Sequence, residues 1–146
     1  MKECESLCVG DLKRHGCCLV GAESSADRTT VVIDFSLTTS SLCSLAFHTE
    51  VSDWRTYLRE KKMLCFDIYA DAMNIQAEVE IHLAKGRNIP TPIVVSGNMI
   101  SYRIPLTQFT NSEIAWSDVT QVCFLFRDDS IKNKTKVVIE NLRLEE

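Results

Sequence analysis

No apolar run in the sequence approaches the roughly 18 residues that a membrane-spanning helix requires. Residues 1–5 (MKECE) also lack the basic and apolar stretches of an export signal. We therefore expect a soluble chain with no membrane partner. Clustered positive charge is missing as well, because 16 dispersed lysines and arginines stand against 20 acids, for a net charge of −4. Since nucleic acids bind to concentrated positive charge, we expect no nucleic-acid partner.

Sequence motifs of common enzymes are absent. There is no Gly-rich nucleotide loop of the G-x-G-x-x-G or G-x-x-x-x-G-K-[ST] type, and no G-x-S-x-G nucleophile turn. The three histidines are scattered, without partners at metal-ligand spacing. His82 and Glu80 on one strand would give a base with an orienting carboxylate, but no nucleophile lies nearby. We predict that the chain is not an enzyme, and catalysis at an unrecognised site ranks behind two noncatalytic interpretations.

Cysteine, by contrast, is abundant, and the seven residues at positions 4, 8, 17, 18, 43, 65 and 123 cannot all pair within the chain. Cys65 and Cys123 fall in apolar strand-like runs, where a free thiol packs as a small core side chain. The N-terminal group consists of Cys4, Cys8, Cys17 and Cys18, with His15 between them. This group has three interpretations: reduced structural thiols, a zinc site, or a disulfide. Its spacing lacks the paired C-x-x-C of structural zinc sites. Reduced thiols fit best and favour a reducing, cytoplasmic compartment; the localisation is otherwise unknown.

Strand signals dominate the chain, and helical periodicity is confined to residues 52–60. Alternating or β-branched runs predict long strands at 29–37, 63–69, 76–83, 98–106, 120–127 and 135–144, and shorter ones at 17–22, 41–47 and 93–96. We expect Lys85-Gly86, Ser96-Gly97 and Asp128-Asp129 to form hairpin turns, and Pro90 and Pro92 to lie in a connection.

Eight or nine short strands at near-regular spacing predict an all-β fold, an antiparallel β-sandwich or barrel with at most short helices. The composition, 45% hydrophobic and 25% charged, is that of a globular domain. We therefore expect one domain over residues 1–146, in which residues 1–28 form an N-terminal arm and the first strand.

Period-two alternation separates a core from an outer face. The inward positions hold Leu64, Phe66, Ile68, Val79, Ile81, Leu83, Ile104, Val122, Phe124 and Phe126. The outward positions of the same strands hold Asp67, Tyr69, Glu80, His82, Arg103, Gln121 and Arg127. This outward set can line a ligand-binding groove, because a ligand rich in hydroxyl groups needs donors and acceptors held on a rigid sheet. The alternative is a solvated outer face. Tyr69 is the leading single candidate.

Four segments carry a resemblance to a known family. Residues 51–58 with 64–71 look like a short lead-in to a central strand, and residues 101–109 contain an I-P-L-x-x-F pattern. Residues 116–126 match a penultimate strand, and residues 138–144 match a closing I-D-N-I-x-L strand with Glu140 in place of Asp. On these segments, residues 51–146 resemble the galactose-binding-like jelly rolls, above all the carbohydrate-binding modules attached to polysaccharide-acting enzymes.

The resemblance implies a noncatalytic, accessory carbohydrate-binding module that binds an oligosaccharide or polysaccharide on one sheet face. It also implies a covalently attached catalytic domain in a longer parent chain, and a structural calcium ion held in part by Glu140. Such modules stack sugars on exposed aromatic rings, but Trp54 and Trp116 fall at lead-in positions that look structural. Because the same sandwich occurs in assembly and adhesion proteins, a protein-interaction domain without sugar binding is the alternative.

Overall fold

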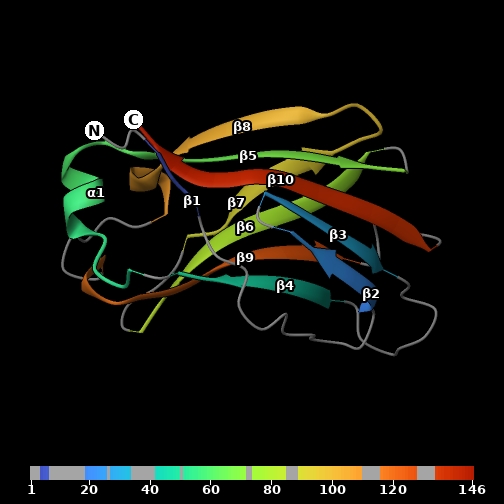
Figure 1. The fold of residues 1–146 in the computed structure, drawn as a ribbon, viewed down its shortest axis with the longest axis horizontal. Helices are drawn as coiled ribbons and strands as arrows, with labels where there is room; N and C mark the ends of the chain where they lie inside the picture. The colour runs from blue at the N-terminus through green and yellow to red at the C-terminus, as the bar shows by residue number, and fades with distance from the viewer. Residues whose placement is uncertain are drawn as a thin grey trace.

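Two antiparallel sheets lie face to face in the computed structural model of the chain (Figure 1). The structure describes residues 4–6, 19–25, 27–33, 42–49, 51–71, 74–84, 89–109, 116–127 and 134–146. These residues confirm the predicted all-β sandwich, because the helical segments among them are short: α1 (Arg55–Arg59), the 3-10 turn η2 (Leu106–Gln108) and the 3-10 residues 116–117. None of the described helices is long or apolar enough to cross a membrane.

Sheet A has the strand order β2-β3-β10-β5-β8, with β1 beside β10. Its strands are β1 (Cys4–Ser6), β2 (Leu19–Ser24), β3 (Arg28–Ile33), β5 (Met63–Ala70), β8 (Ile100–Pro105) and β10 (Thr135–Glu145). Sheet B has the order β4-β9-β6-β7. Its strands are β4 (Leu42–His48), β6 (Ile75–Leu83), β7 (Thr91–Val95) and β9 (Val119–Arg127).

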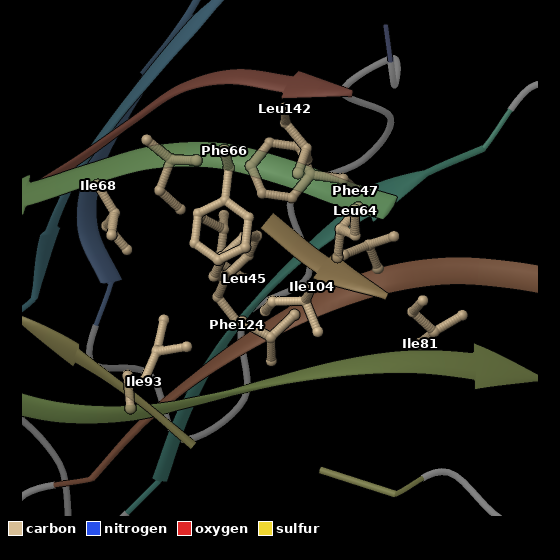
Figure 2. Packing of buried hydrophobic residues seen from close by; sticks show 14 of the residues in the cluster. Leu45, Phe47, Leu64, Phe66, Ile68, Ile81, Ile93, Ile104, Phe124 and Leu142 are labelled. Atoms are coloured by element: carbon tan, nitrogen blue, oxygen red, sulfur yellow. The ribbon is translucent and has the colours of Figure 1, made fainter. Parts of the chain in front are cut away.

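The core lies between the inner faces of the two sheets, as the alternation predicted (Figure 2). Every predicted core residue is buried except Leu83, which is partly buried at the end of β6. Phe124 of β9 lies at the centre of an aromatic cluster. Its ring centroid is 5.0 Å from that of Phe66 and 5.7 Å from that of Phe47, both in edge-to-face geometry.

The predicted strands are confirmed within a few residues wherever the structure describes them, and α1 lies inside the predicted helical stretch 52–60. The short β1 was not predicted, because three residues carry too little alternation to detect. Two turn predictions need correction. Ser96-Gly97 joins β7 of sheet B to β8 of sheet A rather than two paired strands, and Pro92 lies within β7 rather than in a connection. Lys85-Gly86 and Asp128-Asp129 lie outside the described residues.

Pro92 is tolerated because β7 is an edge strand of sheet B. Its neighbour Val94 directs both backbone groups away from β6, toward Tyr102 of β8. The Tyr102 hydroxyl accepts a hydrogen bond from the Val94 N–H at 2.9 Å and donates to the Val94 carbonyl at 2.8 Å. Because backbone groups two residues apart point the same way, the nitrogen of Pro92 also points away from β6. No described strand lies on that side to accept an N–H, so the missing N–H of proline costs no strand hydrogen bond. Sheet B is thus closed at this edge by a side chain of sheet A.

We expect the Tyr102→Phe variant to lose about 1–2 kcal/mol of unfolding free energy, since two hydrogen bonds of modest net value disappear. The freed backbone groups of Val94 would also offer an edge for intermolecular strand pairing. Urea denaturation measures the first effect and size-exclusion chromatography at rising concentration measures the second. The matched control is Tyr69→Phe, which also removes a bonded hydroxyl but exposes no strand edge. Equal self-association of the two variants would contradict this role of Tyr102.

Two of the seven cysteines have described side chains, Cys65 and Cys123, and both are buried thiols that form no disulfide, as predicted. Burial raises the pKa of the Cys65 thiol, although the nearby guanidinium groups of Arg103 and Arg143 act in the opposite direction. Cys8, Cys17, Cys18 and His15 lie outside the described residues. The choice among reduced thiols, zinc and a disulfide for the N-terminal group therefore stays a prediction.

Candidate functional site

The predicted site residues lie on two different sheets. The strands of sheet A carry Asp67, Tyr69 and Arg103. The strands of sheet B carry Glu80, His82, Gln121 and Arg127. Because the outer faces of a sandwich point in opposite directions, these residues cannot line one groove. The prediction that all seven form a single groove is therefore wrong. Alternation separates inward from outward positions, but it does not tell which of two sheets a strand joins.

The outward side chains of sheet A bind one another. Arg103 Nη1 lies 2.7 Å from Glu145 Oε1, and Arg143 Nη2 lies 2.8 Å from Glu145 Oε2. Hydrogen bonds from both guanidinium groups hold the pKa of Glu145 below its usual value, and the Glu145 carboxylate raises the pKa of Arg103. This ion-pair cluster joins β8 to β10 across β5 and occupies the groups that a ligand would need.

A bulge in β10 organises the neighbouring part of sheet A. The register to β5 shifts between Glu140 and Arg143, where Asn141 takes a left-handed backbone conformation with φ of 55° that Asn tolerates. Asn141 Nδ2 donates to Asp67 Oδ2 at 3.0 Å. Burial raises the pKa of Asp67, but hydrogen bonds from Asn141 and Ser101 outweigh it and leave the pKa lowered. The Asp67 carboxylate thus stabilises the bulge.

Tyr69 and Glu140 belong to a third cluster on sheet A. Arg28 Nη2 donates to the Tyr69 hydroxyl at 3.0 Å, and the hydroxyl donates to Glu140 Oε1 at 3.4 Å. Arg28 Nε also lies 3.5 Å from Glu140 Oε1. The described residues contain no group of three or more His, Cys, Asp or Glu side chains that could hold a metal ion. Calcium at Glu140 therefore stays a prediction, with a guanidinium group beside the carboxylate.

On the outer face of sheet B, Glu80, His82 and Gln121 form a hydrogen-bonded chain. His82 pairs in register with Gln121 across β6 and β9. His82 Nε2 lies 2.8 Å from Glu80 Oε2, and Gln121 Nε2 lies 3.0 Å from His82 Nδ1. Both acid and imidazole are partly buried, with side chains 19% and 34% exposed. Burial and short contacts hold the three polar groups in fixed positions on a rigid sheet. The side chain of Arg127 lies outside the described residues.

The chemistry of the three side chains, Glu80, His82 and Gln121, determines which of them donates and which accepts each hydrogen bond. A carboxylate oxygen only accepts, so the hydrogen of a neutral imidazole must be on Nε2, and His82 donates to Glu80. The bare Nδ1 then accepts from the amino group of Gln121. Among the described residues, Glu80 Oε1 and the Gln121 carbonyl oxygen have no hydrogen-bond partner. Two acceptors of hydrogen bonds are thus available at the ends of the chain.

A hollow of about 380 Å³ lies further along β6, where β6 pairs with β7 at the edge of sheet B. It is lined by Gln76, Ala77, Glu78, Pro92, Ile93, Val94 and Tyr102. Its volume is within the range of small-molecule sites. Pro92 and Val94 provide an apolar wall, and Val94 is 44% exposed. This hollow was not predicted from the sequence, because Pro92 was expected to lie in a connection and not in a strand. The alternation of β6, which sets Gln76 and Glu78 beside Glu80 and His82, could have indicated two of its residues.

The two tryptophans are structural, as expected. Trp54 is 1% exposed and Trp116 is fully buried, and their rings stack at 5.9 Å. The Trp54 backbone N–H donates to the Trp116 carbonyl at 2.8 Å, and Trp54 Nε1 donates to the Val51 carbonyl at 2.7 Å. Neither ring is therefore an exposed platform for a sugar.

No family model matches the chain, and no curated protein matches its sequence. Solved structures do match it. An agarase matches 97% of this chain with 23% of its own length, at a TM-score of 0.70 and 13% identity. The family 30 carbohydrate-binding module of a cellulosomal cellulase of Clostridium thermocellum matches 97% with 95% of its own length, at a TM-score of 0.56 and 13% identity. A family 11 carbohydrate-binding module from Clostridium thermocellum, in complex with a β-1,3-1,4-mixed-linked tetrasaccharide, matches 99% with 89%, at 0.57 and 11%.

The carbohydrate-binding modules match over most of their own length, whereas the chain spans about a quarter of the length of the two agarases. At sequence identities this low, the structural similarity carries information on the fold alone. The likeness extends over nearly the whole chain, beyond residues 51–146 on which the sequence resemblance was recognised. The strand order of the two sheets and these matches together establish that the chain has the jelly-roll β-sandwich fold found in carbohydrate-binding modules.

Proposed function

We propose that the chain is a noncatalytic carbohydrate-binding module that binds a glycan on the outer face of sheet B. The observation that carries the proposal is the position of the hollow and the polar chain on one strand, β6. Its outward residues from Gln76 to His82 extend over about 20 Å at the usual rise of a strand. A face of this length accommodates several sugar units in a row.

The chemistry of the face fits a sugar. The hollow offers apolar surface at Pro92 and Val94 for the C–H groups of a pyranose ring. The polar chain offers the Gln121 carbonyl and a Glu80 carboxylate oxygen as acceptors for hydroxyl groups. These groups are pre-organised, because Gln121 and Glu80 are each held by a hydrogen bond to His82. Pre-organisation lowers the entropic cost of binding.

The outer face of sheet A fits this role less well. Its Arg103–Glu145 pair, its Asp67–Asn141 bond and the cluster around Tyr69 consume donors and acceptors within the protein. A sugar would have to break these contacts before it could use the same groups. The Tyr69 hydroxyl in particular is already bonded, so the leading candidate of the sequence analysis stabilises β3, β5 and β10 in this proposal.

Affinity electrophoresis in gels that contain a soluble polysaccharide tests the proposal. Mixed-linked β-1,3-1,4-glucan and agar-derived polysaccharide are the first choices, because similar structures bind or belong to enzymes named for such glycans. We expect the wild-type chain to be retarded. The variants Gln121→Ala, which removes an acceptor, and Val94→Arg, which fills the hollow, should weaken binding by about tenfold or more.

The matched control is Arg103→Ala, an exposed candidate residue on sheet A, which should be retarded like the wild type. Loss of retardation in Arg103→Ala, with Gln121→Ala unchanged, would place the site on sheet A. If no polysaccharide in a broad panel retards the wild-type chain, glycan binding is rejected and a protein-interaction domain of the same fold is favoured.

A further inference from the structure

The chain Glu80–His82–Gln121 connects the ligand-facing group of Gln121 to an ionisable side chain. With a neutral imidazole, the Gln121 amino group donates to His82 Nδ1 at 3.0 Å, so the Gln121 carbonyl is directed elsewhere. Imidazole is the side chain that ordinarily changes its charge between about pH 5 and pH 8. Gln121 is therefore the point at which a proton on His82 can alter what the surface offers.

We propose that protonation of His82 reverses the hydrogen-bonding group that Gln121 presents, and that it thereby changes which glycans bind. This inference rests on the proposed glycan-binding function. When Nδ1 gains a proton it becomes a donor, and the Gln121 amino group can no longer donate to it. A half-turn of the amide lets its carbonyl oxygen accept from Nδ1–H. The amino group then points where the carbonyl pointed before.

Few other charged groups face His82 among the described residues. On β6 itself the neighbour is Glu80, which binds Nε2–H in both protonation states and so keeps the ring orientation fixed. On β9 the neighbours are Gln121 and Thr120, which do not titrate, and the Thr120 hydroxyl donates to the His82 carbonyl at 3.0 Å. On β4 the nearest titratable residue is His48, which pairs in register with Gln121 and lies one strand beyond His82.

The reversal distinguishes anionic from neutral sugars. A hydroxyl group both donates and accepts, so a neutral glycan can follow the turn of the amide with little change in affinity. A sugar carboxylate only accepts. At high pH it would meet the Gln121 carbonyl and the Glu80 carboxylate, both of which repel it. At low pH it would meet the Gln121 amino group, which attracts it, and the charge of the imidazolium would offset that of the Glu80 carboxylate.

The test compares mixed-linked β-1,3-1,4-glucan with the same glucan after part of its primary hydroxyls has been oxidised to carboxylates, which remain ionised at pH 5. We expect the affinity ratio, neutral over oxidised, to fall about tenfold between pH 8 and pH 5 for the wild type, equivalent to ~1.4 kcal/mol. The variant His82→Gln should show a ratio that does not change with pH. The control Glu60→Gln, an exposed acid in the turn after α1, should retain the wild-type fall and so exclude a general charge effect.

A second measurement examines the polar chain in the free protein. Nitrogen-15 NMR of the imidazole should show the Nε2–H tautomer at high pH, and the Gln121 side-chain amide resonances should shift together with the titration of His82. An Nδ1–H tautomer, or Gln121 resonances that ignore that titration, would overturn the proposal. A constant affinity ratio for two retained glucans would overturn the reversal alone. Retention of neither glucan at either pH would instead reject the glycan-binding function on which it rests.

Discussion

The Phe124→Ala variant is expected to lose about 3–5 kcal/mol of unfolding free energy, the usual cost of removing a fully buried aromatic ring. Phe124 is 0% exposed and contacts rings from both sheets, Phe66 of β5 and Phe47 of β4 (Figure 2). These edge-to-face pairs add to the burial energy. Removal of the Phe124 ring would leave a cavity between two sheets that cannot approach each other, because many other side chains separate them.

Urea denaturation followed by circular dichroism measures this loss, read from the transition midpoint at constant slope. The matched control is Leu125→Ala, the next residue of β9, which points outward and is only partly buried. We expect its cost to stay about 1 kcal/mol or less. Because whole domains are stable by only about 5–15 kcal/mol, Phe124→Ala should unfold well below the wild-type midpoint. Similar midpoints for the two variants would mean that the inward face of β9 has been assigned incorrectly.

The inward and outward faces of the strands were predictable from sequence because each strand repeats every two residues. The pattern of β6 illustrates this: Val79 and Ile81 are buried, whereas Glu80 and His82 are partly exposed. The chemistry of a strand in a half-buried sheet forces this alternation, since a shift by one residue would bury charges. The core of the fold therefore followed from local sequence alone.

The candidate site could not be predicted in the same way, because it depends on which strands become neighbours. Tyr69 and His82 both alternate outward, yet β5 pairs with β8 and β10, whereas β6 pairs with β7 and β9. Pairing is a long-range property that the alternation of one strand does not encode. The hollow required further information still. Its wall contains Pro92, which is tolerated because β7 is an edge strand, and the backbone of the neighbouring Val94 binds Tyr102 of the other sheet.

The last prediction concerns Trp54, the residue type that sugar-binding sites most often expose. We expect Trp54→Ala to lose about 3–5 kcal/mol of unfolding free energy, because the ring is 1% exposed and lies against Trp116 and Tyr57. The backbone carbonyl of Trp54 also accepts the hydrogen bond of Leu58 N–H in α1. The variant retains Trp116 as its sole tryptophan, so fluorescence reports on that ring alone. Its emission should shift to the red at urea concentrations that leave the wild type folded.

The control Trp54→Phe keeps an aromatic ring against Trp116 and loses chiefly the 2.7 Å bond from Nε1 to Val51. It should cost about 1–2 kcal/mol, in line with the loss of one hydrogen bond and some ring area. A glycan-stacking role gives the opposite pattern: Trp54→Ala would then keep its urea midpoint and lose its retardation by the polysaccharide. That pattern would contradict the burial of Trp54 and move the glycan site away from sheet B. Stability and binding measured on the same variant therefore separate a core tryptophan from a sugar platform.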